Sequence, residues 1–387
     1  MVYIVCFFSS MFFLWIGTQK YIGVKMNGKY WDNTKYVGIS VVIGIFIPIL
    51  LATFRETSVG SDVEFYVVPY FEQAIETNGF EKYVSLLGGK GQDLAYCLLN
   101  YAITRITSNI GWLFLSVQLI TICFVFAACW QLRDVAAPWL SMLFFYFIFY
   151  NITLSTVRQS CAVALSFYAI ALSLKNGFNK KTIIQSIAVV VCAITFHLTA
   201  IVVVPLLVLG YLIYTKKLNV LATSMSIILF CLMVGIFLEP FMTIISSIVS
   251  AISTKYSKPF FLNSNGAGVG GYTSVILLGM IVTIIQFMLL KRTQSDNSKR
   301  INKVLFVFDV MYVVGMLFLS KIAFIPRLLY YIQIMWNISL AQVGTVVGGR
   351  KGNKIVAEVF ALLIVMIYWM YFFVMGGVHG TYPYILR

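Results

Sequence analysis

Apolar stretches long enough to cross a lipid bilayer recur from one end of this 387-residue chain to the other. A transmembrane helix needs about 20 mostly apolar residues, because the hydrocarbon core is about 30 Å thick. Charged residues make up only 11% of the chain, and its mean hydropathy is +0.92. The signal repeats too often for a cleaved secretory peptide, and no small-residue cleavage site follows the first stretch, so this stretch is also expected to be a crossing. The pattern predicts an all-α polytopic membrane protein with one integral membrane domain, residues 1–387.

About twelve transmembrane helices are predicted, and the charges of the loops orient them. The crossings cover residues 1–16, 36–54, 110–130, 136–154, 159–174, 182–196, 198–214, 218–238, 272–290, 302–320, 328–347 and 355–375. One set of loops carries most of the basic residues and is therefore expected in the cytoplasm, which leaves both termini outside. The net charge of +15 is scattered over short loops, so it does not indicate a nucleic-acid partner.

Two segments do not fit this topology easily. Residues 93–107 are moderately apolar but contain Asn100 and Arg105, so an interfacial or re-entrant helix is expected rather than a crossing. Residues 182–214 lie between two basic loops, which requires a helical hairpin that turns near His197. Its arms are short for a full crossing, so either the bilayer thins there or the hairpin is re-entrant and lines a cavity.

Two loops on the external side are long enough to fold. The first spans residues 55–109 and includes the expected interfacial helix. The second spans residues 239–271 and contains the glycine-rich run Asn-Ser-Asn-Gly-Ala-Gly-Val-Gly-Gly. That run is equally typical of a lid over a site and of a plain flexible linker.

Ionisable residues at the ends of the apolar runs fall on the external side in this topology. They are Arg55, Asp62, Arg158, His197 and Arg327. Ionisable groups within or bordering a membrane segment are costly and usually functional. Guanidinium groups bind phosphate through two parallel hydrogen bonds. A histidine is suited to act as a general base near neutral pH. The set is therefore typical of a phosphate-handling site.

Each of these residues also has an ordinary structural interpretation. Arg55 can be an interfacial arginine with a glycine turn behind it, and Arg158-Gln159 an anchor at a helix start. A lone histidine such as His197 more often packs between helices than catalyses. Arg327 opposes the dipole of the helix it begins, so an anionic partner is expected: Asp62, Glu64, Glu239 or a ligand.

Other polar residues point less clearly to a role. Asp309 and Glu358 lie inside apolar segments without a basic partner in register. His379, Tyr382 and Tyr384 belong to the external tail, where a solvated loop is expected. The cysteines form no Cys-x-x-Cys motif, and only two histidines are present, so neither a disulfide framework nor a metal centre is indicated.

The ordered motifs resemble those of EpsG-type, Wzy-like bacterial polysaccharide polymerases. Arg55 followed by Val59-Gly60-Ser61-Asp62 and Tyr66 resembles the family signature after the second helix. Further landmarks follow in order from about residue 50 to the end of the chain: Arg158-Gln159, Phe196-His197, Arg327 with Tyr330, and Pro383-Tyr384.

The resemblance implies a multi-pass enzyme of the bacterial plasma membrane, with a lipid-sugar glycosyltransferase-like helix bundle and an active site that faces outside. Such enzymes join oligosaccharide repeat units carried on undecaprenyl diphosphate into O-antigen, capsule or exopolysaccharide. They need no metal or other cofactor. Their expected partners are the lipid-linked oligosaccharide, membrane lipid, a flippase and a chain-length regulator.

The implied chemistry assigns roles to the candidate residues. Arg158 and Arg327, then Arg55, stabilise the diphosphate leaving group, and His197 removes the proton of the acceptor hydroxyl, with Asp62 as the competing base. Tyr66, Gln159 and Tyr330 complete the expected substrate contacts. An O-antigen ligase would use the same donor. A flippase would place charge at the bilayer midplane, and an acyltransferase would need access to cytoplasmic acyl-CoA.

Overall fold

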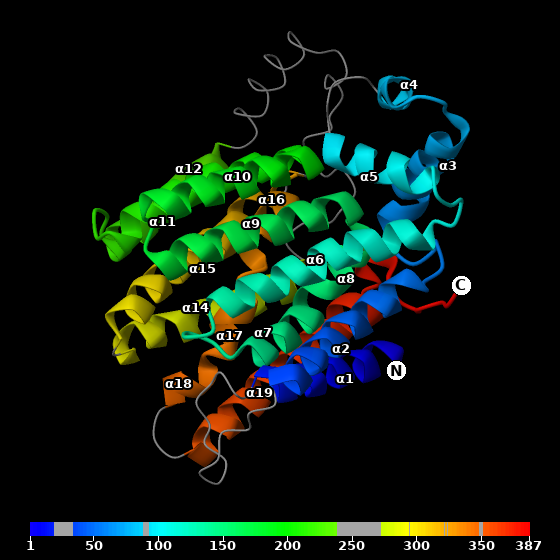
Figure 1. Cartoon of the computed structure of the whole chain (residues 1–387). Helices are drawn as coiled ribbons and strands as arrows, with labels where there is room; N and C mark the ends of the chain where they lie inside the picture. The colour runs from blue at the N-terminus through cyan, green and yellow to red at the C-terminus, as the bar shows by residue number, and fades with distance from the viewer. Residues whose placement is uncertain are drawn as a thin grey trace.

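The computed structural model describes residues 1–18, 34–87, 93–237, 272–293, 295–320, 322, 324–347 and 351–387. Regular secondary structure in this part of the chain is helical, as expected in lipid, where a helix satisfies its own backbone hydrogen bonds. The long helices lie side by side, and α3, α4 and α5 gather at the end of the bundle where the C-terminus also lies (Figure 1). The predicted loop 239–271 lies outside the described residues.

The helices follow the predicted crossings closely. The first half contains α1 (Val2–Thr18), α2 (Thr34–Thr53), α6 (Gly111–Gln131), α7 (Pro138–Phe145), α8 (Asn151–Ser155), α9 (Val157–Asn176) and α10 (Lys180–Phe196). The second half contains α11 (Val203–Tyr214), α12 (Val220–Ile236), α14 (Thr273–Arg292), α15 (Asp296–Leu319), α16 (Ile325–Gln333), α17 (Trp336–Ala341), α18 (Val343–Val347) and α19 (Lys351–Trp369). Short π-helical and 3₁₀ turns extend this order among the described residues: η2 (Val63–Val67), η3 (Tyr146–Tyr150), η7 (Met370–Met375), η4 (Leu198–Val202) and η8 (Val378–Gly380).

Six of the described helical segments are long and apolar enough to cross a membrane, and several shorter apolar helices accompany them. The chain is therefore a polytopic α-helical membrane protein. The full count of twelve crossings stays a prediction. The expected continuous helix over 328–347 is wrong, because the chain forms three short helices there, α16, α17 and α18. Most of this segment is buried, and burial within protein is what allows a broken helix at membrane depth.

Helix α9 lies at the centre of the bundle and packs against α6 and α10. Nearly all of its residues are buried, and many are small, such as Ala162, Ala164 and Ala171. Small side chains allow helix backbones to approach closely in a membrane, where dispersion forces rather than the hydrophobic effect hold helices together. Apolar residues are instead exposed along α12 and α19, as expected for helices that border lipid.

The basic loops meet at one end of the bundle. Lys175 pairs with Asp134, and the Tyr214 hydroxyl donates to Asn297 at 2.6 Å. Phe178, just before α10, packs against Tyr214 at the end of α11, with ring centroids 5.5 Å apart. The start of α10 and the end of α11 therefore lie at the same level, which confirms the predicted hairpin that turns near His197.

The loop over residues 55–109 is largely helical in its described part. It contains η2, α3 (Val68–Glu76), α4 (Phe80–Leu86) and α5 (Leu94–Thr104), the last at the position of the expected interfacial helix.

The structure explains why the Val59-Gly60 motif needs a glycine. The φ of Gly60 is +113°, and a Cβ atom there would lie 2.7 Å from the carbonyl oxygen of Leu154. Only glycine combines that backbone conformation with such a close approach to α8.

The C-terminal tail is packed against the start of this loop, contrary to the expectation of a solvated segment. The Arg387 amide donates to the Phe54 carbonyl at 2.8 Å, and the Glu56 amide donates to the Ile385 carbonyl at 2.9 Å. The Tyr384 hydroxyl donates to the carbonyl of Leu51. These bonds satisfy backbone polar groups of both segments, so the tail is a structural part of this end of the bundle.

Candidate functional site

Arg158, Asp93 and His197 form one connected group. Asp93 Oδ2 lies 2.5 Å from Arg158 Nη1, and Asp93 Oδ1 lies 3.1 Å from His197 Nδ1. The carboxylate is nearly buried, with 8% of the side chain exposed. Since a carboxylate only accepts hydrogen bonds, Nδ1 of His197 donates to Asp93, and in the neutral imidazole Nε2 is then the acceptor. A histidine oriented in this way is suited to general-base chemistry.

Local backbone geometry brings the three side chains together. Thr156 has ψ 57° and interrupts the helix, so that α9 begins at Val157 and Arg158 lies in its first turn. His197 has extended backbone between α10 and η4. Asp93 has φ 62°, a left-handed conformation that aspartate tolerates better than most residues. Each residue therefore lies at or next to a helix end.

Aromatic rings surround the Arg158 guanidinium. Its central carbon lies 5.3 Å from the ring centroid of Tyr70 and 5.9 Å from those of Tyr66 and Tyr96. Cation–π contacts of this kind hold a guanidinium in place without neutralising it. The predicted substrate residue Tyr66 thus belongs to the Arg158 group, and about half of its surface is exposed.

Arg327 and Asp62 form a second pair at the same end of the bundle. Arg327 Nη2 lies 3.3 Å from Asp62 Oδ2, and 53% of the arginine side chain is exposed. The expected anionic partner of Arg327 is therefore Asp62. Exposed pairs of this kind contribute about 0–1 kcal/mol to stability, so a competing anion can displace the carboxylate at little cost.

Gln159 joins the two pairs. Its Nε2 donates to the backbone carbonyl of Arg327 at 2.7 Å, and it follows Arg158 directly in the chain. Ser155, at the end of α8, accepts a hydrogen bond from the Asp62 amide at 3.3 Å. We call Asp62, Asp93, Arg158, Gln159, His197 and Arg327 the paired-arginine cluster. It is assembled around the start of α9.

Arg55 occupies a different environment from the cluster. The side chain is buried, and its guanidinium lies over the ring of Phe114 at 4.3 Å. Its Nε and Nη1 atoms have no hydrogen-bond partner within the described part of the chain. Burial lowers the pKa of Arg55 to about 10. The predicted contact between Arg55 and a diphosphate stays a prediction.

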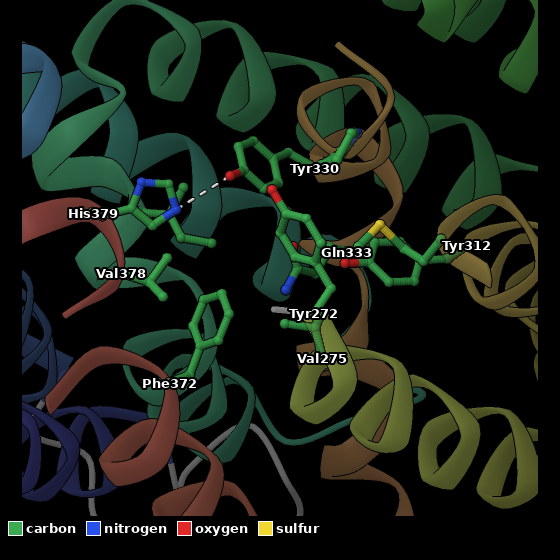
Figure 2. A pocket seen from close by; sticks show the side chains of 11 residues that line it. Tyr272, Val275, Tyr312, Tyr330, Gln333, Phe372, Val378 and His379 are labelled. Carbon is green, nitrogen blue, oxygen red and sulfur yellow. Dashed lines mark hydrogen bonds between the residues drawn. The ribbon is translucent and has the colours of Figure 1, made fainter. Parts of the chain in front are cut away.

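His379 and Tyr330 meet beside the cluster. The Tyr330 hydroxyl lies 3.2 Å from His379 Nε2, as the dashed line in Figure 2 marks. Burial, and then the neighbouring charge of Arg327, lowers the pKa of His379 to about 4, so the imidazole is neutral at physiological pH. The expectation that His379 is a solvated tail residue is wrong, because the tail folds back onto the bundle.

Sequence reasoning placed Asp93 and His379 on the external side but selected neither as a site residue. Asp93 directly precedes an apolar helix, a position typical of a helix cap, yet its side chain makes no capping hydrogen bond. It points to Arg158 and His197 instead. The sequence offered two separate signals: Asp93 at a helix-cap position, and Arg158 without an acidic neighbour in the chain. Only the tertiary fold brings these two residues together.

Asp309 and Glu358 lie elsewhere. Asp309 is buried in α15 and accepts a hydrogen bond from Ser339 at 3.4 Å. Glu358 lies on α19 beside Gly344. Within the described residues, no group of three histidine, cysteine, aspartate or glutamate side chains is placed to hold a metal ion.

These features define a class: a multi-pass membrane protein that gathers two arginines, two carboxylates and an oriented histidine at one end of its helix bundle. The chain belongs to the EpsG family, whose match covers residues 38–386 and so includes the whole paired-arginine cluster. The family is associated with exopolysaccharide synthesis. Searches of curated proteins and of solved structures found no significant match to this chain.

Proposed function

We propose that this protein is a glycosyltransferase that polymerises undecaprenyl-diphosphate-linked oligosaccharide repeat units on the outer face of the bacterial plasma membrane. The observation that carries the proposal is the Asp93 carboxylate, which binds Arg158 and His197 at once. Positive charge close to the departing diphosphate and an oriented base are the two features that this transfer requires. Family membership adds the link to exopolysaccharide.

In the proposed reaction, an acceptor sugar hydroxyl attacks the anomeric carbon of the growing chain. The new C–O bond forms as the bond to the diphosphate oxygen breaks, and the hydroxyl proton passes to Nε2 of His197. Negative charge develops on the departing diphosphate. Arg327 is the arginine most available to bind that charge, because its pairing with Asp62 is exposed. Arg158, held by Asp93 and three tyrosines, supplies a fixed positive charge nearby.

Glycan laddering in cells tests the proposal. A strain lacking the gene is complemented with wild type, Arg158→Ala or Arg300→Ala. Arg300 forms an exposed pair with Asp296 in α15, away from the cluster, and serves as the matched control. We expect the deletion to leave single repeat units on the lipid carrier or core. Wild type and Arg300→Ala should restore the ladder, and Arg158→Ala should not.

The same gel separates the other functions. Loss of all surface glycan in the deletion strain would indicate export, and a free polymer that never reaches its final acceptor would indicate a ligase. An intact ladder in the deletion strain, or full restoration by Arg158→Ala, would contradict the proposal.

A further inference from the structure

Tyr331 lies where the elements that carry the paired-arginine cluster meet. It is on α16, four residues after Arg327, and residues four apart lie on the same face of a helix. Helix α16 packs against α9, which carries Arg158 and Gln159, and against η4, the 3₁₀ turn that follows His197. Helix α9 and η4 also pack against each other, so the three elements form one junction.

The Tyr331 hydroxyl is bonded to the turn that carries His197. Its oxygen lies 3.0 Å from Oγ1 of Thr199, which is a hydrogen-bond distance. Thr199 is the second residue after His197, and in the same turn the His197 carbonyl accepts a hydrogen bond from the Ala200 amide at 3.0 Å. A displacement of Thr199 therefore displaces the backbone that holds the imidazole.

The same hydroxyl faces other members of the cluster. The Gln159 side chain, which donates to the Arg327 carbonyl at 2.7 Å, is a close neighbour of the Tyr331 hydroxyl. The Asp93 carboxylate is close enough for its charge to act on this hydroxyl as well. One polar group on the Arg327 helix therefore lies beside the His197 turn, the Gln159 amide and the central carboxylate of the cluster.

Tyr331 is enclosed by protein and acts through its neighbours. None of its surface is exposed, whereas 53% of the Arg327 side chain is. A substrate at the cluster can therefore contact Arg327 but not the Tyr331 hydroxyl. Side chains that bind or react keep their geometry only where packing and hydrogen bonds around them hold it, and Tyr331 is placed to supply that support.

We propose that Tyr331 is a positioning residue for the proposed glycosyl transfer: its hydroxyl fixes the turn of His197 against the helix of Arg327. The proposal rests on the proposed function, in which His197 takes the proton of the acceptor hydroxyl and Arg327 binds the departing diphosphate. Both groups act in one transition state, so the distance between them enters the rate. Without the hydroxyl the ring still fills its place, but the turn is free to shift relative to α16.

Transfer by the purified full-length protein in lipid nanodiscs, with lipid-linked repeat units as substrate, tests the proposal. Tyr331→Phe removes the hydroxyl and keeps the ring, and Thr199→Val removes the other partner of the hydrogen bond. Tyr146→Phe is the matched control. Tyr146 is as buried as Tyr331, but its hydroxyl lies 2.8 Å from the Ser10 hydroxyl and so links η3 to α1, outside the cluster. Thermal unfolding verifies that each variant is folded.

We expect Tyr331→Phe to lower kcat about tenfold to a hundredfold, the size of effect that a misplacement of about 1 Å produces. KM should stay within about twofold of the wild-type value, because the hydroxyl contacts no substrate. Thr199→Val should have the same effect, and the double variant should be about as slow as the slower single variant. Tyr146→Phe should lower the melting temperature by an amount similar to Tyr331→Phe but leave kcat and KM unchanged. If Tyr331→Phe does not fold, Thr199→Val carries the test.

A wild-type kcat for Tyr331→Phe and Thr199→Val would overturn the proposal, as would an equal loss of kcat in Tyr146→Phe. Losses that multiply in the double variant would also overturn it, because the hydroxyl would then act through a partner other than Thr199. Failure of the proposed function is recognised separately, since the wild-type protein would then transfer no repeat units and the deletion strain would keep its glycan ladder.

Discussion

Replacing Asp93 by asparagine should disable the cluster while leaving the fold in place. The Asp93→Asn substitution keeps the size of the side chain but removes the charge that pairs with Arg158 and the double acceptor that orients His197. The introduced amide can present its NH₂ group to the imidazole, which favours the wrong tautomer. Both functions of the carboxylate are lost in a single substitution.

The expected loss of stability follows from how deeply the ion pair between Asp93 and Arg158 is buried. Breaking a fully buried ion pair costs about 3–5 kcal/mol, whereas exposed pairs contribute about 0–1 kcal/mol. Arg158 and Asp93 are 23% and 8% exposed, so we expect an intermediate loss of about 2–3 kcal/mol in the free energy of unfolding. General-base catalysis contributes about 10²- to 10⁴-fold to a rate, and the transfer rate should fall within that range.

The assay is single-turnover transfer by purified protein in lipid nanodiscs, using lipid-linked repeat units, together with thermal unfolding. Asp134→Asn is the matched control, because Asp134 forms an ion pair with Lys175 at the opposite end of the bundle and is 59% exposed. It should change stability by less than about 1 kcal/mol and leave the rate unchanged.

The double variant Asp93→Asn/His197→Gln measures the coupling of the two residues. If Asp93 acts through His197, the double variant should be about as slow as His197→Gln alone. A wild-type transfer rate for Asp93→Asn, or losses that simply multiply in the double variant, would refute the reasoning.

Two further substitutions test the geometry at the end of the bundle that holds the paired-arginine cluster. Gly60→Ala should destabilise the protein by more than Gly79→Ala: both glycines have positive φ, but a Cβ atom at residue 60 would lie 2.7 Å from the Leu154 carbonyl oxygen, whereas one at residue 79 meets nothing within 4 Å. Equal melting temperatures would contradict this account. The lowered pKa of His379 predicts acid sensitivity: unfolded chains bind its proton below about pH 6.5, the folded protein only below about 4, so stability is lost as pH falls across that window. His379→Gln should flatten the dependence of melting temperature on pH between 6.5 and 4, and identical slopes for variant and wild type would exclude the burial of a neutral imidazole.

Most of the helical framework follows from hydropathy, because bilayer thickness sets helix length. The exception, residues 328–347, is instructive. Gln333, Asn337 and Gln342 are buried there, and their neighbours form three short helices. Hydropathy averages over such a segment and reports only that it is apolar. Whether the backbone breaks depends on polar partners supplied by other helices, which no local pattern contains.

A site contact could be predicted from the sequence where a residue's local position requires a partner of known charge. Arg327 opposes the dipole of α16, and that argument alone leads to a short set of acids that includes Asp62. Asp93 gives no such signal. It is separated in sequence by 65 residues from Arg158 and by 104 from His197, and its own position resembles a helix cap. Pairings of this kind are properties of the tertiary fold.

The two arginines are unequal in a way that matters for the proposed chemistry. Both begin helices of the bundle, and both find their acids in the loop over residues 55–109. The Arg158 pair is mostly buried, so releasing Asp93 would leave a charge unpaired at a cost of about 2–3 kcal/mol. The Arg327 pair is exposed, and exchanging Asp62 for a diphosphate costs little. In the proposed reaction, Arg158 therefore holds the loop and the histidine in place, and Arg327 is the arginine available to bind the diphosphate.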